Sequence, residues 1–496
     1  MRILFWLIVF FPFFTQAQNN AEIHFDLKNA KADQLHLLNS DYTNPAILFG
    51  EREERVPLNE GKAVWESQIS KPVFISFAYF ESKTKYYMYK LYLSPGDSLQ
   101  VAFDVDHPDS TIVVKGRGQR HSQPLFQELF AGRDRLKVFE KDSLPYDVLN
   151  TIKLQSIENK QILKDYIKKY NPGKSFVDVN TLYLEYYPIW TYLSFKGNQS
   201  YHVGAAYERN ENKWQAIEDS LRIQIPRDNP ELFAVPDYVY FLPVHISRIK
   251  EYVWNHKDLL PYYYDTDSQE EALQLFEKDH ENLLMEKIID KHFEGKTAEF
   301  LYATLFKGAI NQKEDNLPEI FSRFVKKYPN SAYTPYIEPA IREVEEKRTR
   351  KLNDNMLLVE NPDTFKTFDD VLKSVKGKTV LLDMWGTWCG PCRTELSVNS
   401  EAIKKHFKDS DLEYLYIANY DLGKEEAWKQ LIAYYNLEGT HIMASHQLTT
   451  DIMEQLGTSG YPTYAIIKKD GTFELSKAGY PMNRKILIDQ LESALK

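Results

Sequence analysis

The spacing of hydrophobic and polar residues follows three patterns along the chain, one after another. In the first region, apolar residues at 23, 25 and 27 alternate with polar ones, which is typical of a half-buried strand. Aromatic and β-branched runs follow at 73–77, 86–93, 99–105 and 111–114, with a turn-forming Ser-Pro-Gly-Asp-Ser segment at 94–98. Short strands at this spacing predict a β-sandwich-like domain over residues 18–118.

The pattern becomes helical from about residue 119. Apolar residues at three- and four-residue spacing predict helices near 145–170, 180–196, 212–224, 245–260, 268–293 and 297–310. Another helix is expected to begin at Pro124, because proline at the first helical position costs no hydrogen bond. The helices show no clean period, so we expect an irregular helical domain over residues 119–350 rather than a solenoid. The charged run 343–354 is interpreted as a solvated helix face or linker that ends this domain.

Strands and helices alternate in the last region, which predicts an α/β domain over residues 351–496. Residues 378–385 predict a buried strand that runs directly into Gly386–Arg393 and then into an amphipathic helix. Lys469–Thr472 predicts a hairpin turn between the last two strands. The chain is therefore expected to be multidomain, as its 496 residues also require, because a single hydrophobic core does not grow to that size.

The first residues have the pattern of an export signal. A basic Met1-Arg2 start precedes the apolar run Ile3–Phe14, whose 12 residues are too few to span a bilayer. Thr15-Gln16-Ala17 then offers a small-x-small cleavage site, so residues 1–17 are predicted to be a signal peptide. The alternatives are a buried strand or an uncleaved anchor. We expect a mature protein that begins near Gln18 and is soluble in the periplasm or cell envelope.

The composition and net charge of the chain limit the kinds of molecule that it is expected to bind. The chain is 43% hydrophobic and 27% charged, as soluble globular proteins are, so extensive disorder is not expected. Its formal net charge is -10. Nucleic acids and anionic membranes attract basic proteins, so we expect no nucleic-acid partner.

The two cysteines of the chain, Cys389 and Cys392, lie three residues apart. A bridge that closes so short a loop hardly constrains the unfolded chain, so this spacing favours redox chemistry over a structural bridge. Structural zinc requires four ligands, and without a third Cys and with His406 as the nearest downstream His, no metal site is expected. No Gly-rich loop for a phosphate cofactor follows a strand, and we expect no cofactor.

Cys389 falls at the start of the predicted helix, where unpaired backbone N–H groups and the helix dipole stabilise a thiolate. We expect Cys389 to attack a target disulfide and the shielded Cys392, one turn further on, to resolve the mixed disulfide. Pro391 suits the first helical turn, and Gly390 leaves the nucleophile uncrowded.

The segment Trp385–Glu395, WGTWCGPCRTE, resembles the thioredoxin superfamily and most of all its exported TlpA-like branch of thiol–disulfide oxidoreductases. That branch carries WxxWCxPC, then basic residues, then a Glu three positions after the second Cys. A second motif, Gly460–Tyr464, resembles the Pro loop of the family. The resemblance covers residues 355–496 and implies a thioredoxin fold with a cis Tyr461–Pro462 bond facing Cys389. It also implies that a substrate is bound by Trp388, Gly390, Pro391, Tyr461 and Pro462.

Two acids are candidates for the group that exchanges a proton with Cys392. Asp383 lies six residues before Cys389, where thioredoxins keep a buried acid, and burial would raise its pKa. Glu395, early in the same helix as Cys392, is the alternative. Each also has a plain structural interpretation, as a strand-end Asp and a solvated helix residue. Thioredoxins place a Lys near the buried acid, and the matching strand 413–418 has none.

The leading interpretation is an exported enzyme that reduces disulfides in proteins or peptides, because Gly-Pro between the cysteines is the pair found in reducing thioredoxins. A membrane thiol donor is then needed, since the compartment is oxidising. The alternative is an envelope binding or scaffold protein whose residues 18–350 recognise a client, with the redox domain accessory. A thiol peroxidase is a third interpretation, which the CxxC spacing disfavours.

Overall fold

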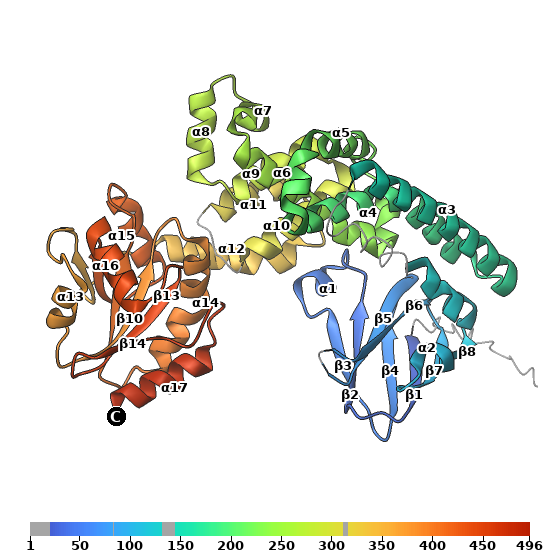
Figure 1. The fold of residues 1–496 in the computed structure, drawn as a ribbon, viewed down its shortest axis with the longest axis horizontal. Coiled ribbons are helices and arrows are strands. Elements are labelled where there is room, and N and C mark those ends of the chain that lie inside the picture. Colours follow the sequence, from blue (N-terminus) through green and yellow to red (C-terminus); the bar gives the residue numbers. More distant parts are fainter. Residues whose placement is uncertain (1–19, 83, 131–143, 311–315) are drawn as a thin grey trace, which may run out of the picture. The chain divides into compact units, whose positions relative to one another are not determined.

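A computed structural model describes residues 20–82, 84–130, 144–310 and 316–496 (Figure 1). The predicted signal peptide, residues 1–17, lies outside the described residues. The chain divides into two compact units, Met1–Thr304 and Leu305–Lys496. Among the described residues, no helix combines the length and the apolar character needed to cross a membrane. The division into four parts stays a prediction.

Strands at the start of the first unit form two four-stranded sheets that share one core. One sheet has the order β4 (Lys62–Gln68), β1 (Asn20–Lys28), β7 (Ser98–Asp104), β8 (Val113–Arg117). The other has the order β3 (Glu53–Pro57), β2 (Gln34–Asn39), β5 (Val73–Phe80), β6 (Tyr86–Leu93). Alternate residues of both sheets, such as Ile23 and Phe77, are buried in a single cluster, so the period-two pattern in the sequence marks the core face. The strand predicted at 111–114 begins later, at Val113, because Pro108–Thr111 form a helical turn.

Helices make up most of the described residues that follow, up to Ile310. The shorter elements are α1 (Pro45–Phe49), α2 (Pro108–Thr111) and 3₁₀ turns at Gln119–His121, Pro230–Ala234 and Lys257–Leu259. The longer ones are α3 (Pro145–Tyr170), α4 (Lys174–Arg209), α5 (Glu211–Arg222), α6 (Pro236–Asn255), α7 (Leu260–Tyr264), α8 (Gln269–Lys278), α9 (Asn282–His292) and α10 (Gly295–Ile310). The helix expected from Pro124 is a 3₁₀ segment, 124–130. The single helix predicted over 268–293 is wrong, because Asp279 accepts backbone hydrogen bonds from Glu281, Asn282 and Leu283 and starts a second helix there.

The second unit is built on a six-stranded sheet of order β14–β13–β10–β11–β12–β9. The strands are β9 (Met356–Val359), β10 (Thr379–Trp385), β11 (Leu412–Ala418), β12 (Gly439–Met443), β13 (Thr463–Ile467) and β14 (Phe473–Leu475). The predicted strand before the cysteines is the central β10, every residue of which is buried. It runs parallel to β11 and antiparallel to β13. The predicted turn at Lys469–Thr472 joins β13 to β14, with Gly471 at a φ of 89°.

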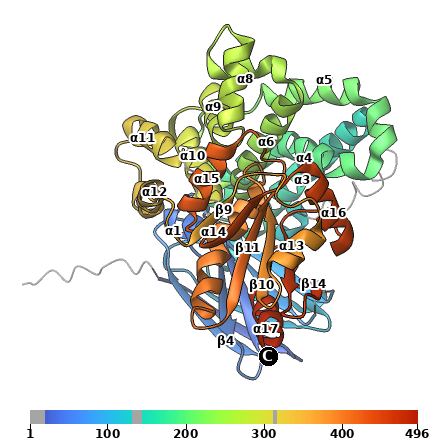
Figure 2. The same cartoon turned by 90° about the vertical axis from the view of Figure 1, so that its left-hand side faces the viewer.

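Helices cover both faces of this sheet (Figure 2). They are α13 (Phe368–Ser374), α14 (Gly390–His406), α15 (Glu425–Tyr434), α16 (His446–Leu456) and α17 (Arg484–Leu495). Successive β10 side chains point to opposite faces: Leu382 and Met384 pack with α13 and α16, whereas Leu381 and Trp385 pack on the side of α14. Asp383 shares the α14 face, so an acid lies in the interior beneath the helix that carries the cysteines.

Two further helices, α11 (Leu317–Lys327) and α12 (Thr334–Arg348), belong to the same unit as this sheet. Val344 on α12 is 1% exposed and lies in the core cluster that contains both cysteines. Lys347 lies over the Tyr434 ring, and Arg350 donates a hydrogen bond of 3.0 Å to the Tyr434 carbonyl. The prediction that run 343–354 is solvated is therefore only partly right, because one face of α12 is buried in the second unit.

Val344→Ala should lower the free energy of unfolding of the second unit by about 1–3 kcal/mol, because it removes buried methyl groups and leaves a cavity. Hydrogen exchange of the β10 backbone amides, which open when this unit unfolds, measures the change. Glu345→Ala, at the exposed neighbouring position of the same helix, is the matched control and should change exchange little. Equal exchange rates in the two variants would contradict the packing role of α12.

Candidate active site

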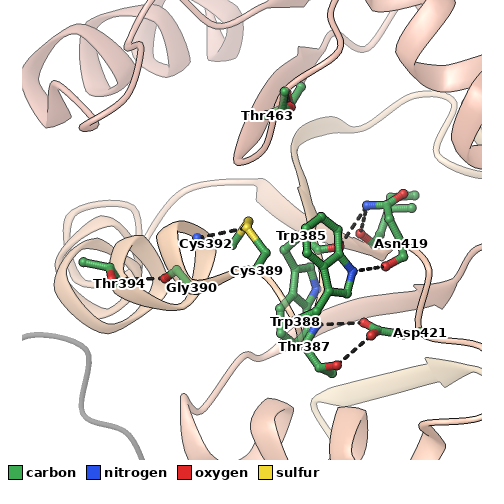
Figure 3. Close-up of a disulfide and its surroundings, with 12 residues drawn as sticks. Trp385, Thr387, Trp388, Cys389, Gly390, Cys392, Thr394, Asn419, Asp421 and Thr463 are labelled. Carbon is green, nitrogen blue, oxygen red and sulfur yellow. Dashed lines mark hydrogen bonds between the residues drawn. A yellow bond between two sulfur atoms is a disulfide. The ribbon is translucent and has the colours of Figure 1, made fainter. Parts of the chain in front are cut away.

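Cys389 and Cys392 form a disulfide at the junction between β10 and α14 (Figure 3). Cys389 is the N-cap residue of α14, and its Sγ accepts a hydrogen bond of 3.2 Å from the backbone N–H of Cys392. Both side chains are buried, in a cluster that includes Trp385 and Trp428. The predicted position of Cys389 at the helix N-terminus is confirmed. A thiolate formed there would gain from the same N–H group and from the helix dipole.

Gly390 and Pro391 form the first turn of α14 between the two cysteines. No atom outside the local chain lies within 4 Å of where a Gly390 Cβ would be, so this side of the disulfide is uncrowded, as predicted. Pro391 is exposed.

The turn before Cys389 is held by two residues that follow β11. Asp421 accepts hydrogen bonds from the backbone N–H and the hydroxyl of Thr387, at 2.9 and 2.6 Å. The Trp388 indole N–H donates to the Asn419 carbonyl at 2.8 Å, and the Asn419 side chain donates to the Trp385 carbonyl at 2.9 Å (Figure 3). Asn419 and Asp421 were missed in the sequence. The signal that could have found them is their place just after a buried parallel strand, at the edge where such folds build their sites.

The Tyr461–Pro462 peptide bond is cis, as the resemblance implies. The Tyr461 ring packs edge-on against Trp388, with 5.6 Å between ring centroids, and also contacts the core cluster that contains both cysteines. Thr463, the first residue of β13, donates its hydroxyl to the Gly460 carbonyl at 2.6 Å, and Figure 3 shows it across from the disulfide. Antiparallel pairing of β13 with β10 therefore brings this loop to the cysteines.

Asp383 is almost fully enclosed on β10, with 5% of its surface exposed. Its neighbours on the adjacent strands are Tyr416 of β11 and Tyr464 of β13, so a tyrosine stands in the register position on each side. Burial, together with the nearby charge of Glu395, raises the pKa of Asp383 to about 8. The carboxyl group is therefore protonated at neutral pH in the oxidised protein.

Glu395 is buried too and is not a solvated helix residue. One carboxylate oxygen accepts a hydrogen bond of 3.1 Å from the Met482 backbone N–H, and the other accepts from the Asn399 amide. The Asn399 carbonyl oxygen in turn accepts from the Arg484 guanidinium at 2.8 and 3.0 Å. Both carboxylate oxygens of Glu395 thus accept hydrogen bonds from N–H donors.

Asp383 and Glu395 line the same small cavity of about 20 Å³, together with Ser400 and Tyr414. A cavity of that size has room for about one water molecule, and the two carboxyl groups offer it polar partners. The structure thus brings together both acids that the sequence offered as alternatives, one protonated and one held as an acceptor.

Asp383→Asn should stabilise the oxidised protein at high pH. The pKa of Asp383 is about 8 in the folded protein, above its unfolded value of 3.8. The contribution of this acid to the free energy of unfolding is therefore fully present below pH 4 and is lost as the pH rises to and through 8. The variant should therefore exceed the wild type in stability by about 3–6 kcal/mol at pH 9, and the gap should shrink toward pH 4. Urea unfolding across this pH range measures the gap, and a gap independent of pH would contradict the raised pKa.

Glu395→Gln should lower the pKa of Asp383, because it removes the like charge across the cavity. Titration of the Asp383 carboxyl carbon by NMR measures the change directly. The matched control is Glu401→Gln, an exposed acid on the same helix, which should leave the titration where it is in the wild type. An unchanged Asp383 titration in Glu395→Gln would show that burial alone sets this pKa.

Comparison with known proteins agrees with this geometry. Residues 362–491 match the Redoxin family model. The thiol-disulfide oxidoreductase ResA of Bacillus cereus is 33% identical over 101 residues, which are 20% of this chain and 54% of that protein. The thioredoxin-like protein YneN of Bacillus subtilis is 28% identical over 124 residues, 24% of this chain and 68% of that protein. The chain thus spans about half the length of the ResA relatives that it matches.

Among solved structures, the thioredoxin domain of a thiol-disulfide oxidoreductase from Bacteroides vulgatus is 21% identical. The match covers 25% of this chain and 84% of that one, with a TM-score of 0.22. The family match, the relatives and the WCGPC junction at the end of the central strand β10 agree on one assignment. The C-terminal domain of this chain belongs to the thioredoxin superfamily, in its TlpA-like branch.

Proposed function

We propose that this protein is an exported thiol–disulfide oxidoreductase that reduces disulfides in proteins or peptides through Cys389 and Cys392. The observation that carries the proposal is the Cys389–Cys392 disulfide at the N-terminus of α14, beside the loop with the cis Tyr461–Pro462 bond. A disulfide that closes so short a loop has little stabilising effect, so its place at a helix N-terminus is best explained by chemistry.

The reaction begins with both cysteines reduced. The Cys389 thiolate attacks one sulfur of a client disulfide, which forms a Cys389–client mixed disulfide and releases the first client thiolate. The Cys392 thiolate then attacks Cys389 Sγ, so the Cys389–Cys392 disulfide forms and the second client thiolate leaves. Two electrons pass from the protein to the client, and the two client thiolates take up two protons. An external dithiol donor then reduces the pair again.

Asp383 is the proton partner of Cys392 in this proposal. Its pKa of about 8 is close to the pKa of about 8.5 of an ordinary thiol, and proton transfer is efficient between groups with matched pKa values. The protonated Asp383 of the oxidised form can give its proton to the Cys392 thiolate when a donor reduces the disulfide, and can take it back during turnover. The charge of Glu395 affects this proton exchange because it raises the pKa of Asp383.

Export is proposed from the apolar run Ile3–Phe14 and the cleavage pattern Thr15-Gln16-Ala17. In an oxidising compartment a reductase needs a steady supply of electrons, so the donor is proposed to be a thiol carrier in the membrane. The clients are proposed to be proteins or peptides with disulfides, because the C-terminal domain is similar to thiol-disulfide oxidoreductases.

Cys389→Ser should abolish reduction of insulin disulfides, and Cys392→Ser should leave clients covalently trapped on Cys389, because the resolving thiol is missing. Turbidity of reduced insulin measures the first effect, and non-reducing gel electrophoresis with mass spectrometry measures the second. The double variant is the matched control and should trap nothing. Full activity in Cys389→Ser would overturn the proposed function.

A further inference from the structure

Three aromatic side chains form a continuous surface beside the disulfide. Trp388, Tyr420 and Tyr461 come from the turn before α14, the segment after β11 and the loop before β13. Their ring centroids lie 5.6 Å apart for Trp388 and Tyr461, 6.1 Å for Trp388 and Tyr420, and 6.5 Å for Tyr420 and Tyr461. We call these three side chains the aromatic wall. Trp388 and Tyr420 are 43% and 49% exposed, so the wall is open to solvent on one side.

The backbone holds Tyr420 in the wall. Its φ is 57°, a left-handed conformation that residues with bulky side chains rarely adopt. The residues on both sides are fully buried and hydrogen-bonded: Asn419 to Trp385 and Ile417, and Asp421 to Thr387. Two anchored neighbours thus force the residue between them outward. The Tyr420 ring is further supported by His446, whose ring packs edge-on at 5.7 Å.

The wall is suited to an apolar group. The one polar atom of Trp388, its indole N–H, already donates to the Asn419 carbonyl, so the indole offers only its ring to a ligand. Cys389, next to Trp388 in the chain, is only 3% exposed, and Tyr461 of the aromatic wall packs against the core cluster that contains it. A client disulfide that reaches this sulfur brings its own neighbouring residues close to the aromatic wall. In an extended segment, adjacent residues are about 3.3 Å apart along the chain. This spacing is shorter than the distances of 5.6 Å and more between the ring centroids of the aromatic wall, so a residue next to the client cysteine stays within the width of the wall.

We propose that Tyr420 makes this site selective for disulfides whose cysteine is followed or preceded by an apolar side chain in an extended segment. The inference rests on the proposed function, and it names the class of substrate that the site prefers. The apolar side chain packs on Tyr420 and Trp388 while the client sulfur meets Cys389. A charged or strongly polar side chain packed on the Trp388 ring loses its water without gaining a hydrogen bond, because the indole N–H is already bonded.

The test uses the full-length protein and two disulfide-bonded peptides of the same length that differ only beside the cysteine, Leu in one and Ser in the other. Wild type should show a kcat/KM for the Leu peptide about 5- to 20-fold above that for the Ser peptide, as expected for burial of one apolar side chain. In Tyr420→Asn the ratio should fall to about 1–3, because the ring is gone while asparagine tolerates the left-handed backbone. The matched control Tyr420→Phe keeps the ring and should keep the ratio.

The outcomes separate this inference from the function on which it rests. A wild-type ratio near 1 overturns the inference even if Tyr420→Asn fails to fold, and so does an undiminished ratio in a folded Tyr420→Asn. In both cases the peptides are still reduced and the proposed function stands. A wild-type protein that reduces neither peptide, nor insulin, overturns the proposed function and this inference with it.

Discussion

The site depends on one junction, at which the buried strand β10 stops and α14 begins. Because Cys389 is the N-cap residue, the same backbone N–H that starts the helix also donates to the cysteine sulfur. Contacts with residues outside the junction hold it in place. Thr387 and Trp388 are tied to the end of β11 through Asp421 and Asn419, so parallel pairing of two strands sets the direction in which the helix N-terminus points.

The second physical constraint is the burial of two carboxyl groups beneath α14. An isolated buried carboxylate is costly, and the structure meets this cost differently for the two acids. Glu395 is supplied with N–H donors from Met482 and Asn399, and Arg484 secures the second of these. Asp383 instead retains its proton at neutral pH, because burial and the nearby charge of Glu395 raise its pKa. The strand beside Asp383 has no lysine, as the sequence already shows, and in the structure Tyr416 occupies the position next to Asp383.

Prediction from sequence succeeded where the pattern was local. The buried strand before the cysteines, the helix after them and the placement of Cys389 at the helix start all follow from a few consecutive residues. The alternating strands of the N-terminal part also follow from period-two patterns. Errors arose where one side-chain contact changed the outcome. Asp279 splits a helix that apolar spacing alone would continue, and the buried face of α12 turns part of a charged run into core.

By itself the sequence determined the order of strands and helices around the cysteines, the redox pair and, through its resemblance to a known family, the loop with the cis proline. These are encoded in short segments, because hydrophobic period, turn chemistry and the three-residue cysteine spacing are properties of neighbours in the chain. Only the tertiary structure decided that Asn419 and Asp421 hold the turn, that Tyr420 stands beside Trp388, and that Asp383 and Glu395 share one cavity. Each of these depends on the pairing of β11 and β13 with β10, and no local pattern specifies which strands lie side by side.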